Sequence, residues 1–261
     1  MIRLSIDDRV AEVCLDAPQR MNALDEQALA DLAAAYAEIT TQAEAGRVRA
    51  VLLHGTGRGF CAGRDISAVD PADDDATAYL RERVTPVLRA MSEAPVPTFA
   101  AVQGACLGVG LGLAIATDVV YVAEDAKIGS PFAALGATLD SGGHWLFTER
   151  LGPHRALDLI YTAELMSGAE AVQAGLFSRS VPAEDLLEFT RERVGRAASG
   201  ATLAFRASKE LVAQIRDRRV GLWESLDAEN VAQGELCGTA DYAEGFAAFQ
   251  AKRPPEFTGR A

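Results

Sequence analysis

Two glycine-rich segments could each bring backbone N–H groups close to a ligand. They are residues 55–66 (GTGRGFCAGRDI) and residues 102–114 (VQGACLGVGLGLA), and each follows a predicted strand. Glycine permits tight turns and close approach of the backbone to a ligand. The second segment continues into a predicted helix, whose N-terminus offers unpaired N–H groups and a positive dipole end. Alone, either segment could be a tight loop or a packing contact, and the first lacks dinucleotide-binding spacing.

One acidic residue, Asp140, lies in a setting where it could move protons. It belongs to residues 136–146 (GATLDSGGHWL), just before a predicted helix. An aspartate in this position also has the form of a helix N-cap. His144 follows four residues later, a spacing that predicts the same helix face, and it could tune Asp140 or contact a substrate. A Ser141–His144–Asp140 triad is not supported, because residues from adjacent turns rarely supply the geometry.

The chain divides into a first half that alternates strands and helices and a second half that is mainly helical. Strands are predicted at 2–7, 10–15, 49–54, 98–103 and 119–123, with helices at 25–45, 76–92 and 108–117 and an acidic loop at 70–75. Later helices are predicted at 142–151, 153–163, 168–174, 183–199, 202–216, 221–235 and 239–251, with one extended segment at 179–181. This order indicates an α/β core followed by a helical module.

Composition excludes several classes of protein. The 261 residues carry 37 acidic and 25 basic side chains, and a net charge of -12 argues against binding a nucleic-acid backbone. The N-terminus has scattered charges and no apolar core, so it does not resemble a signal peptide, and no stretch is apolar enough to span a membrane. The three histidines and four cysteines have no metal-ligand spacing. We expect a cytoplasmic protein without a bound metal.

Four ordered segments together resemble the signature motifs of the crotonase (enoyl-CoA hydratase/isomerase) superfamily. They are residues 18–24 (PQRMNAL), 60–66 (FCAGRDI), 107–110 (LGVG) and 249–257 (FQAKRPPEF), and the resemblance extends over almost the whole chain. It implies the α/β crotonase fold, in which β-β-α units wind into a spiral. The spiral would occupy residues 1–200, and a helical module at 201–261 would build a homotrimer or a dimer of trimers.

The resemblance also implies chemistry on acyl-CoA thioesters. Such reactions pass through an enolate-like species, which two preorganised N–H donors stabilise at the thioester oxygen. By motif position, the donors are the backbone N–H groups of Arg64 and Val109. Coenzyme A would enter as part of the substrate, without a tightly bound cofactor.

Six residues are expected from the resemblance to contact coenzyme A. Ala62, Asp65 and Ile66 would lie at the adenine end, mostly through backbone contacts. Arg20 would border the pantetheine or phosphate path. Phe249 and Lys252 would reach the coenzyme A of a neighbouring subunit, where Lys252 supplies positive charge for phosphate.

The sequence departs from the hydratases of the superfamily at both of their catalytic glutamates. Gly112 and Phe132 stand at those positions. The segment around Asp140 instead resembles the ring-type isomerases, such as 1,2-epoxyphenylacetyl-CoA isomerase, which implies that Asp140 carries the proton. Its pocket is expected to be lined by Phe132, Leu135, Leu139, His144 and Trp145, and an apolar lining would disfavour the charged carboxylate.

Three hypotheses follow. The first is an enoyl-CoA isomerase that shuttles a proton through Asp140. The second is an enoyl-CoA hydratase or hydrolase with an atypical acid or bound water. The third is a non-catalytic acyl-CoA-binding protein that kept the N–H donors. Gly112 and Phe132 favour the third hypothesis, whereas Asp140 favours the first.

Overall fold

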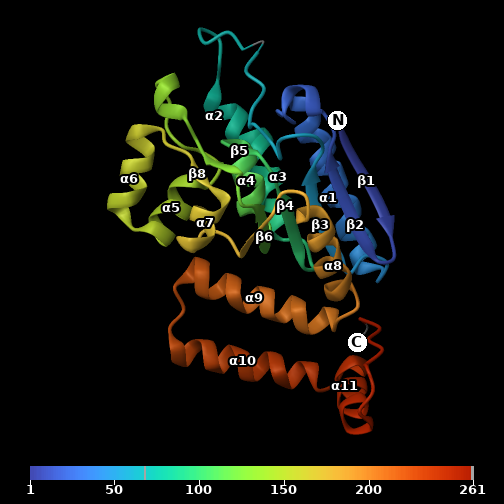
Figure 1. Cartoon of the computed structure of the whole chain (residues 1–261). Helices are drawn as coiled ribbons and strands as arrows, with labels where there is room; N and C mark the ends of the chain where they lie inside the picture. Colours follow the sequence, from blue (N-terminus) through green and yellow to red (C-terminus); the bar gives the residue numbers. More distant parts are fainter. Residues whose placement is uncertain (68, 260–261) are drawn as a thin grey trace.

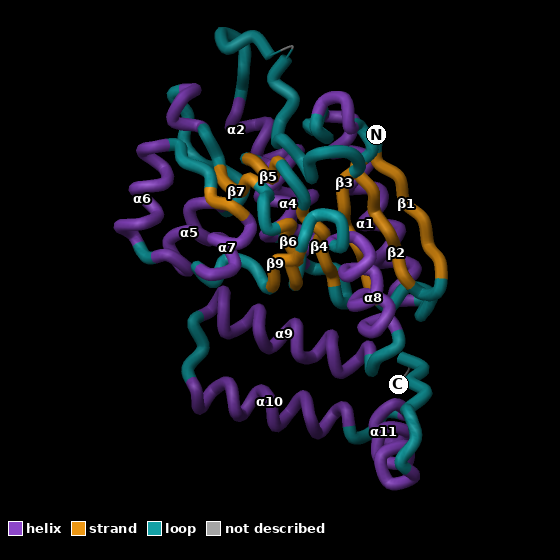
Figure 2. Tube along the Cα trace, viewed as in Figure 1, coloured by secondary structure: helices purple, strands orange, loops and turns teal. Residues whose placement is uncertain are grey.

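A computed structural model describes residues 1–67 and 69–259, and a six-stranded sheet forms the centre of the molecule (Figures 1 and 2). Its order is β1-β2-β3-β4-β6-β9. The strands are β1 (Ile2–Asp7), β2 (Val10–Leu15), β3 (Ala50–Gly55), β4 (Thr98–Val102), β6 (Val119–Ala123) and β9 (Arg179–Val181). β1 and β2 form an antiparallel hairpin, and the other neighbours pair parallel. All residues of β3 and β4 are buried, as expected for parallel strands covered on both faces.

A second sheet joins segments that the sequence analysis did not identify as strands. Its order is β5-β7-β8, with β5 (Ala105–Leu107), β7 (Lys127–Gly129) and β8 (Met166–Ser167). Two or three residues are too few to display the alternation that marks a strand. β5 lies inside the second glycine-rich segment, so this small sheet helps to fix that segment's position.

Helices cover both sheets at nearly the predicted positions. They are α1 (Glu26–Glu44), α2 (Ala76–Ala78), α3 (Thr85–Ser92), α4 (Val109–Ile115), α5 (Gly143–Leu151), α6 (Pro153–Thr162), α7 (Gly168–Gln173) and α8 (Leu186–Ala198), with short 3-10 helices η1 (Pro18–Arg20) and η3 (Phe132–Leu135). Asp25 caps α1 by accepting a hydrogen bond from the Ala28 N–H at 2.8 Å. The buried face of α1 is apolar, and this periodic apolar pattern is why the sequence predicts a helix at 25–45.

The helix predicted at 76–92 is interrupted by a π-helical stretch. Tyr79–Val84 forms this stretch (η2) between α2 and α3. Pro86, in the first turn of α3, has no N–H to donate to the preceding turn, and the Thr85 N–H bonds instead to Leu80, five residues back. Such π-bulges often occur at functional sites.

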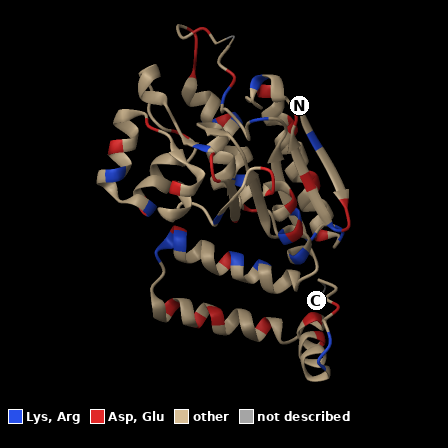
Figure 3. Cartoon of the chain, in the orientation of Figure 1, with Lys and Arg blue, Asp and Glu red and all other residues tan. Residues whose placement is uncertain are grey.

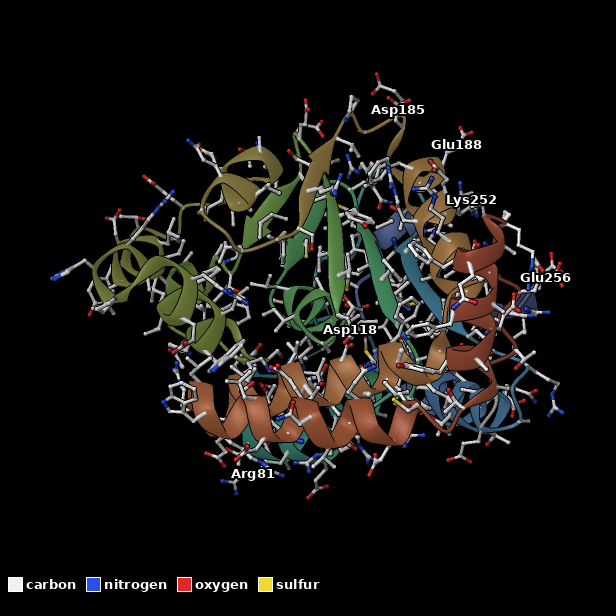
Figure 4. The ribbon with its side chains drawn as sticks, turned by 90° about the horizontal axis from the view of Figure 1, so that it is seen from below. Arg81, Asp118, Asp185, Glu188, Lys252 and Glu256 are labelled. Carbon is white, nitrogen blue, oxygen red and sulfur yellow. The ribbon has the colours of Figure 1, made fainter. Side chains whose placement is uncertain are left out.

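Three helices follow the core and lie together below it in Figure 1. They are α9 (Thr202–Arg218), α10 (Leu222–Leu236) and α11 (Ala240–Ala251), and the α/β architecture with a helical C-terminal region is thus confirmed. Lys209 of α9 pairs with Asp118 of the core at 3.0 Å, and Asp118 lies close to α9 in Figure 4. Buried Arg49 donates to the Thr202 hydroxyl at 2.7 Å and to the Phe257 carbonyl at 2.9 Å. These bonds attach the C-terminal module and its tail to the core.

Within residues 1–67 and 69–259, every helix falls short of the length and apolarity needed to cross a membrane.

Candidate active site

Backbone hydrogen bonds fix the two glycine-rich segments side by side. The Phe60 N–H donates to the Gln103 carbonyl at 2.6 Å, and the Cys61 N–H donates to the Ala105 carbonyl at 2.9 Å. The Leu107 N–H returns a bond to the Cys61 carbonyl at 3.0 Å. The two predicted ligand-binding segments therefore form one structural unit.

Two glycines allow this contact. A Cβ atom on Gly110 would lie 2.4 Å from the Cys61 carbonyl oxygen. Gly63 has φ +95°, and a Cβ atom there would lie 2.8 Å from the Leu107 carbonyl oxygen. A side chain at either position would push the segments apart, so close backbone approach explains both glycines.

The N–H groups of Arg64 and Val109 are free at this contact. The Gly63 carbonyl and the Asp65 N–H on either side of Arg64 both bond to Leu24, at 2.8 and 2.9 Å. The Arg64 N–H itself has no partner in the described part of the chain, nor does that of Val109, the first residue of α4. A Cβ on Gly63 would lie 3.5 Å from the Val109 nitrogen, so the free donors are neighbours. Two such donors can hold one developing oxyanion.

The segment with Asp140 packs against the second glycine-rich segment. The Phe132 ring would lie 2.8 Å from a Cβ atom on Gly108, and Ser141 Cβ would lie 2.5 Å from one on Gly112. A glutamate at position 112, where hydratases carry one, would collide with Ser141. At position 112, the local structure thus has no room for the hydratase carboxylate.

Asp140 is a partly buried carboxylate that does not cap the following helix. Oxygen Oδ1 is buried and has no hydrogen-bond partner within residues 1–67 and 69–259. Burial raises the pKa of Asp140, while the Ser141 hydroxyl, Arg64 and His144 act in the opposite direction. The N-cap of α5 is Gly142, and no side chain donates or accepts a capping bond there.

His144 has a different relation to Asp140 from the one predicted. Asp140 lies in an irregular segment, and α5 begins only at Gly143, so the two residues do not share a helix face. His144 is exposed, and its Nε2 lies 3.2 Å from the Thr138 hydroxyl.

The sequence analysis did not identify Tyr79 and Asp74 as neighbours of the site. The Arg64 guanidinium forms a two-pronged ion pair with Asp74, at 2.8 and 2.9 Å, and lies 4.0 Å from the centre of the Tyr79 ring. Asp74 belongs to the acidic loop before α2, whose aspartates are red in Figure 3. The Tyr79 hydroxyl is buried, and burial raises the pKa of Tyr79 to about 12. Neither residue stands out in sequence, because each belongs to an otherwise ordinary loop or helix.

The five predicted pocket residues lie in different surroundings. Phe132 covers Gly108, and Leu139 is buried in the core, whereas Leu135 is 62% exposed. Trp145 lines a groove of about 590 Å³ under α9, where the Arg216 guanidinium lies 5.9 Å from its ring. The structure therefore brings Phe132 to the free N–H groups, and it orients Trp145 toward the C-terminal module.

The residues predicted to contact coenzyme A form two separate groups. Arg20 pairs with Asp65 at 3.0 Å, and the Ala62 N–H bonds to Met21 at 2.9 Å, so the first two motifs adjoin. Ile66, beside them, is 53% exposed.

The second group belongs to the C-terminal module. Phe249 is 84% exposed, and Lys252 lies at the end of α11 (Figure 4). Because α11 lies on the far side of the core from the glycine-rich segments in Figure 1, neither residue approaches them within one chain.

Comparisons with known proteins give a consistent result. A family model described as enoyl-CoA hydratase/isomerase matches residues 5–260. A probable enoyl-CoA hydratase of Rhodobacter capsulatus is 37% identical, over 99% of this chain and 98% of its own. The 1,2-epoxyphenylacetyl-CoA isomerase of Escherichia coli is 30% identical, over 98% and 97%. A crystal structure of enoyl-CoA hydratase from Bacillus anthracis superimposes with a TM-score of 0.88 and 30% identity, covering 99% of each chain.

Proposed function

The chain belongs to the enoyl-CoA hydratase/isomerase family, whose members act on coenzyme A thioesters, and we infer that it is an isomerase that moves a proton through Asp140. The substrate would be an enoyl-CoA whose double bond changes position along the acyl chain. The N–H groups of Arg64 and Val109 would hold the thioester oxygen.

The reaction needs one base and two sites of proton transfer. The Asp140 carboxylate removes a proton from the carbon beside the thioester, and the electron pair of that C–H bond forms an enolate. Negative charge then grows on the thioester oxygen, where two N–H donors stabilise it. The enolate electrons re-form the carbonyl and shift the double bond toward the thioester, and Asp140 returns its proton to the distal carbon. No other reactant is required.

A single observation carries this proposal: Oδ1 of Asp140, the residue before the Ser141 that packs on Gly112 of α4, is buried and has no hydrogen-bond partner among the described residues. A raised pKa brings such a group closer to useful proton exchange near neutral pH. Gly112 packs so closely on Ser141 that a hydratase glutamate would not fit.

Hydration with Asp140 as the only acid is the second candidate. Several relatives are named as enoyl-CoA hydratases, which favours this candidate. Hydration needs one proton taken from water and one proton given to the acyl chain. With Asp140 as the only carboxylate, one of these two transfers would lack an acid or base to perform it.

Turnover of an enoyl-CoA panel tests the proposal. We expect 3-enoyl-CoA to be converted to 2-enoyl-CoA, while 2-enoyl-CoA is hydrated at least about a hundredfold more slowly, because a missing general acid or base typically costs that much. Faster hydration would replace the isomerase by the second candidate. Tight binding of both esters without turnover would indicate the non-catalytic protein, and no binding at all would remove the proposal.

The chain is further proposed to assemble as a homotrimer or a dimer of trimers. Large apolar side chains of α10 and α11 are exposed, with Trp223 at 77% and Phe249 at 84%. A partner chain that covers them would remove apolar area from water and could bring Phe249 and Lys252 to a neighbour's coenzyme A. Sedimentation should give three or six times the monomer mass, and a monomer alone would contradict this assembly.

A further inference from the structure

A cysteine, a histidine and a glutamate meet on the face of the main sheet where α8 packs on β2 and β3 (Figure 1). Glu12 and Cys14 are two residues apart in β2, so their side chains point to the same face. His54 is the register partner of Cys14 in the parallel pair of β2 and β3. The Nε2 atom of His54 lies 2.9 Å from Oε1 of Glu12. The three side chains therefore form one cluster, which the proposed isomerisation does not use.

Glu12 determines which nitrogen of His54 carries a hydrogen. The carboxylate also accepts two hydrogen bonds from Arg191 of α8, at 2.6 and 3.2 Å. Hydrogen bonding from Arg191 and the charge of His54 lower the pKa of Glu12, although burial opposes them. An ionised carboxylate can only accept, so Nε2 of His54 must be the donor. In the neutral ring, Nδ1 is then left as the acceptor.

This acceptor nitrogen of His54 is buried beside the Cys14 thiol. His54 is only 6% exposed, and its Nδ1 makes no well-aligned hydrogen bond among the residues that the structure describes. The Cys14 thiol is nonetheless close enough to act on the ring. Burial acts to lower the pKa of His54, but bonding to Cys14 and the charge of Glu12 outweigh burial and raise that pKa. A histidine held by a carboxylate in this way can take the proton of a neighbouring thiol.

Arg3 supplies a further positive charge to the sulfur. Arg3 on β1 and His54 on β3 are the register partners of Cys14 on its two sides. The Nη2 atom of Arg3 lies 3.4 Å from Sγ of Cys14, and Asp16 pairs with Arg3 at 3.1 Å. Burial acts to raise the pKa of Cys14, but His54 and Arg3 outweigh burial and lower that pKa below its ordinary value of 9.0. The cluster therefore favours the thiolate, the nucleophilic form of cysteine.

Cys61 and Cys106 show the effect of burial without such neighbours. Both are 0% exposed, and burial raises the pKa of Cys61 to about 12 and the pKa of Cys106 well above its ordinary value. Cys14 is almost as buried, at 6% exposed, yet its pKa moves in the opposite direction. The neighbours of Cys14, and not its burial, therefore determine its chemistry.

We propose that Cys14 is a reactive thiol that small peroxides oxidise to a sulfenic acid, with His54 and Glu12 as its activating pair. This inference goes beyond action on acyl-CoA thioesters and does not depend on it. The thiolate sulfur attacks one peroxide oxygen, and the O–O bond breaks. The proton that His54 took from the thiol passes to the departing hydroxide, which leaves as water. Sulfur is oxidised and the peroxide is reduced, and the small size of hydrogen peroxide suits a thiol that is nearly buried.

Treatment of the full chain with hydrogen peroxide, followed by dimedone labelling and peptide mass spectrometry, measures the oxidation rate at each cysteine. We expect Cys14 to be oxidised at least about threefold faster than the exposed Cys237 at neutral pH, because the gain in thiolate exceeds the loss of intrinsic nucleophilicity. Cys61 is the buried control and should remain unlabelled. Oxidation of Cys14 no faster than that of Cys237 would overturn the inference. Labelling of Cys61 at the Cys14 rate would mean that the reagent attacks unfolded chains, and would overturn it equally.

His54→Gln separates activation of the thiol from its mere exposure. A glutamine at this position can still donate to Glu12, but it cannot take the thiol proton. The oxidation rate of Cys14 should therefore fall severalfold at neutral pH and recover as the pH rises toward the ordinary pKa of a thiol. A structural disturbance alone would not produce this dependence on pH.

Arg3→Gln provides a second test on the surface, since the Arg3 side chain is 65% exposed and its loss should leave the fold intact. It should lower the Cys14 rate in the same direction as His54→Gln, but by less. Arg206→Gln is the matched control, because Arg206 is an exposed arginine of α9 that pairs with Glu210. A Cys14 rate unchanged by both His54→Gln and Arg3→Gln, or lowered equally by Arg206→Gln, would overturn the inference.

Discussion

Backbone hydrogen bonds join the two glycine-rich segments, whereas residues 131–142 meet the second of them through the side chains of Phe132 and Ser141 and are exposed between 133 and 138. In the former, each segment donates N–H groups to the other, and Gly63 and Gly110 leave no space between them. In the latter, backbone bonds are local, such as the Ala137 N–H to the Phe132 carbonyl at 3.0 Å. Oδ1 of Asp140 is buried there and has no hydrogen-bond partner within residues 1–67 and 69–259.

This difference separates two tasks of the site. Stabilising an oxyanion requires donors that do not reorganise during the reaction, and a network of backbone bonds supplies that rigidity. Choosing the reaction requires only one or two side chains at the right place. We infer that the glycine-rich segments serve thioester chemistry in general, and that residues 131–142 set the reaction and the substrate.

Gly63→Ala should have the largest effect, a loss of turnover. A Cβ atom would lie 2.8 Å from the Leu107 carbonyl at φ +95°, so the Arg64 N–H should be displaced. Loss of one oxyanion donor typically lowers turnover about 10²- to 10³-fold. Gly136→Ala is the control in the other region, because φ is +68° there but a Cβ atom meets nothing within 4 Å. Equal losses in steady-state kinetics of the two variants would contradict the contrast between the regions.

The contact between Gly112 and Ser141, where the two regions meet, should make the free energy of unfolding sensitive to added side-chain volume. Gly112→Ala would place a Cβ atom 2.5 Å from Ser141 Cβ, and such overpacking typically costs about 1–3 kcal/mol of unfolding free energy. Gly234→Ala in α10 meets nothing within 4 Å and should stabilise by about 0.4–1 kcal/mol. Urea unfolding measures both. If the two variants are equally stable, Ser141 has space to move, and the packing argument against a glutamate at 112 fails.

The pKa of Asp140 should affect activity and stability in opposite directions as pH rises. Burial raises the pKa of Asp140 above its ordinary value of 3.8, so turnover should fall as pH drops through that raised value. A carboxyl with a raised folded-state pKa favours folding when protonated, and this contribution is lost as pH rises through the folded-state pKa. Asp140→Asn should therefore be more stable than the original chain at neutral pH, and this gain should disappear in acid.

Asp25→Asn should show the opposite trend in the same unfolding experiment. The Ala28 N–H and Arg20 lower the pKa of Asp25, so its contribution to stability exists above its unfolded-state pKa and is lost in acid. A loss of stability in Asp140→Asn at neutral pH, parallel to that of Asp25→Asn, would show that Asp140 is a structural residue.

The smallest expected effect is from Asp74→Asn. The Arg64–Asp74 side chains are each 23% exposed, and a pair of this kind contributes about 0.2–1 kcal/mol. Because the proposed donor is the backbone N–H of Arg64, turnover should change by no more than about threefold at low salt, and less at high salt. A loss above about tenfold would mean that the ion pair, and not the backbone network alone, orders the first segment.

The sequence contained enough information to predict the main elements but not the contacts of the site. Apolar periodicity located α1 and the C-terminal helices, and the glycine-rich motifs indicated the paired segments. β5, β7 and β8 were missed because their residues alternate over too short a distance. The π-helical stretch before Pro86 could not be read from a pattern that is otherwise helical.

Side-chain relations were harder to predict than elements. His144 was placed on the same helix face as Asp140 because the spacing is four residues, but α5 begins after Asp140. Tyr79 and Asp74 meet Arg64 only through tertiary folding, so no local sequence signal marks them. The steric reason for Gly112 was likewise hidden, since it depends on Ser141 from another element.

Isomerisation of 3-enoyl-CoA by Asp140→Asn, with binding of the same ester measured in parallel, tests the central claim most directly. Asparagine keeps the size of the side chain but cannot accept a proton. We expect turnover to fall about a hundredfold or more while affinity and the circular dichroism spectrum stay unchanged. Unchanged turnover would contradict the account and make His144 the next candidate for the proton carrier.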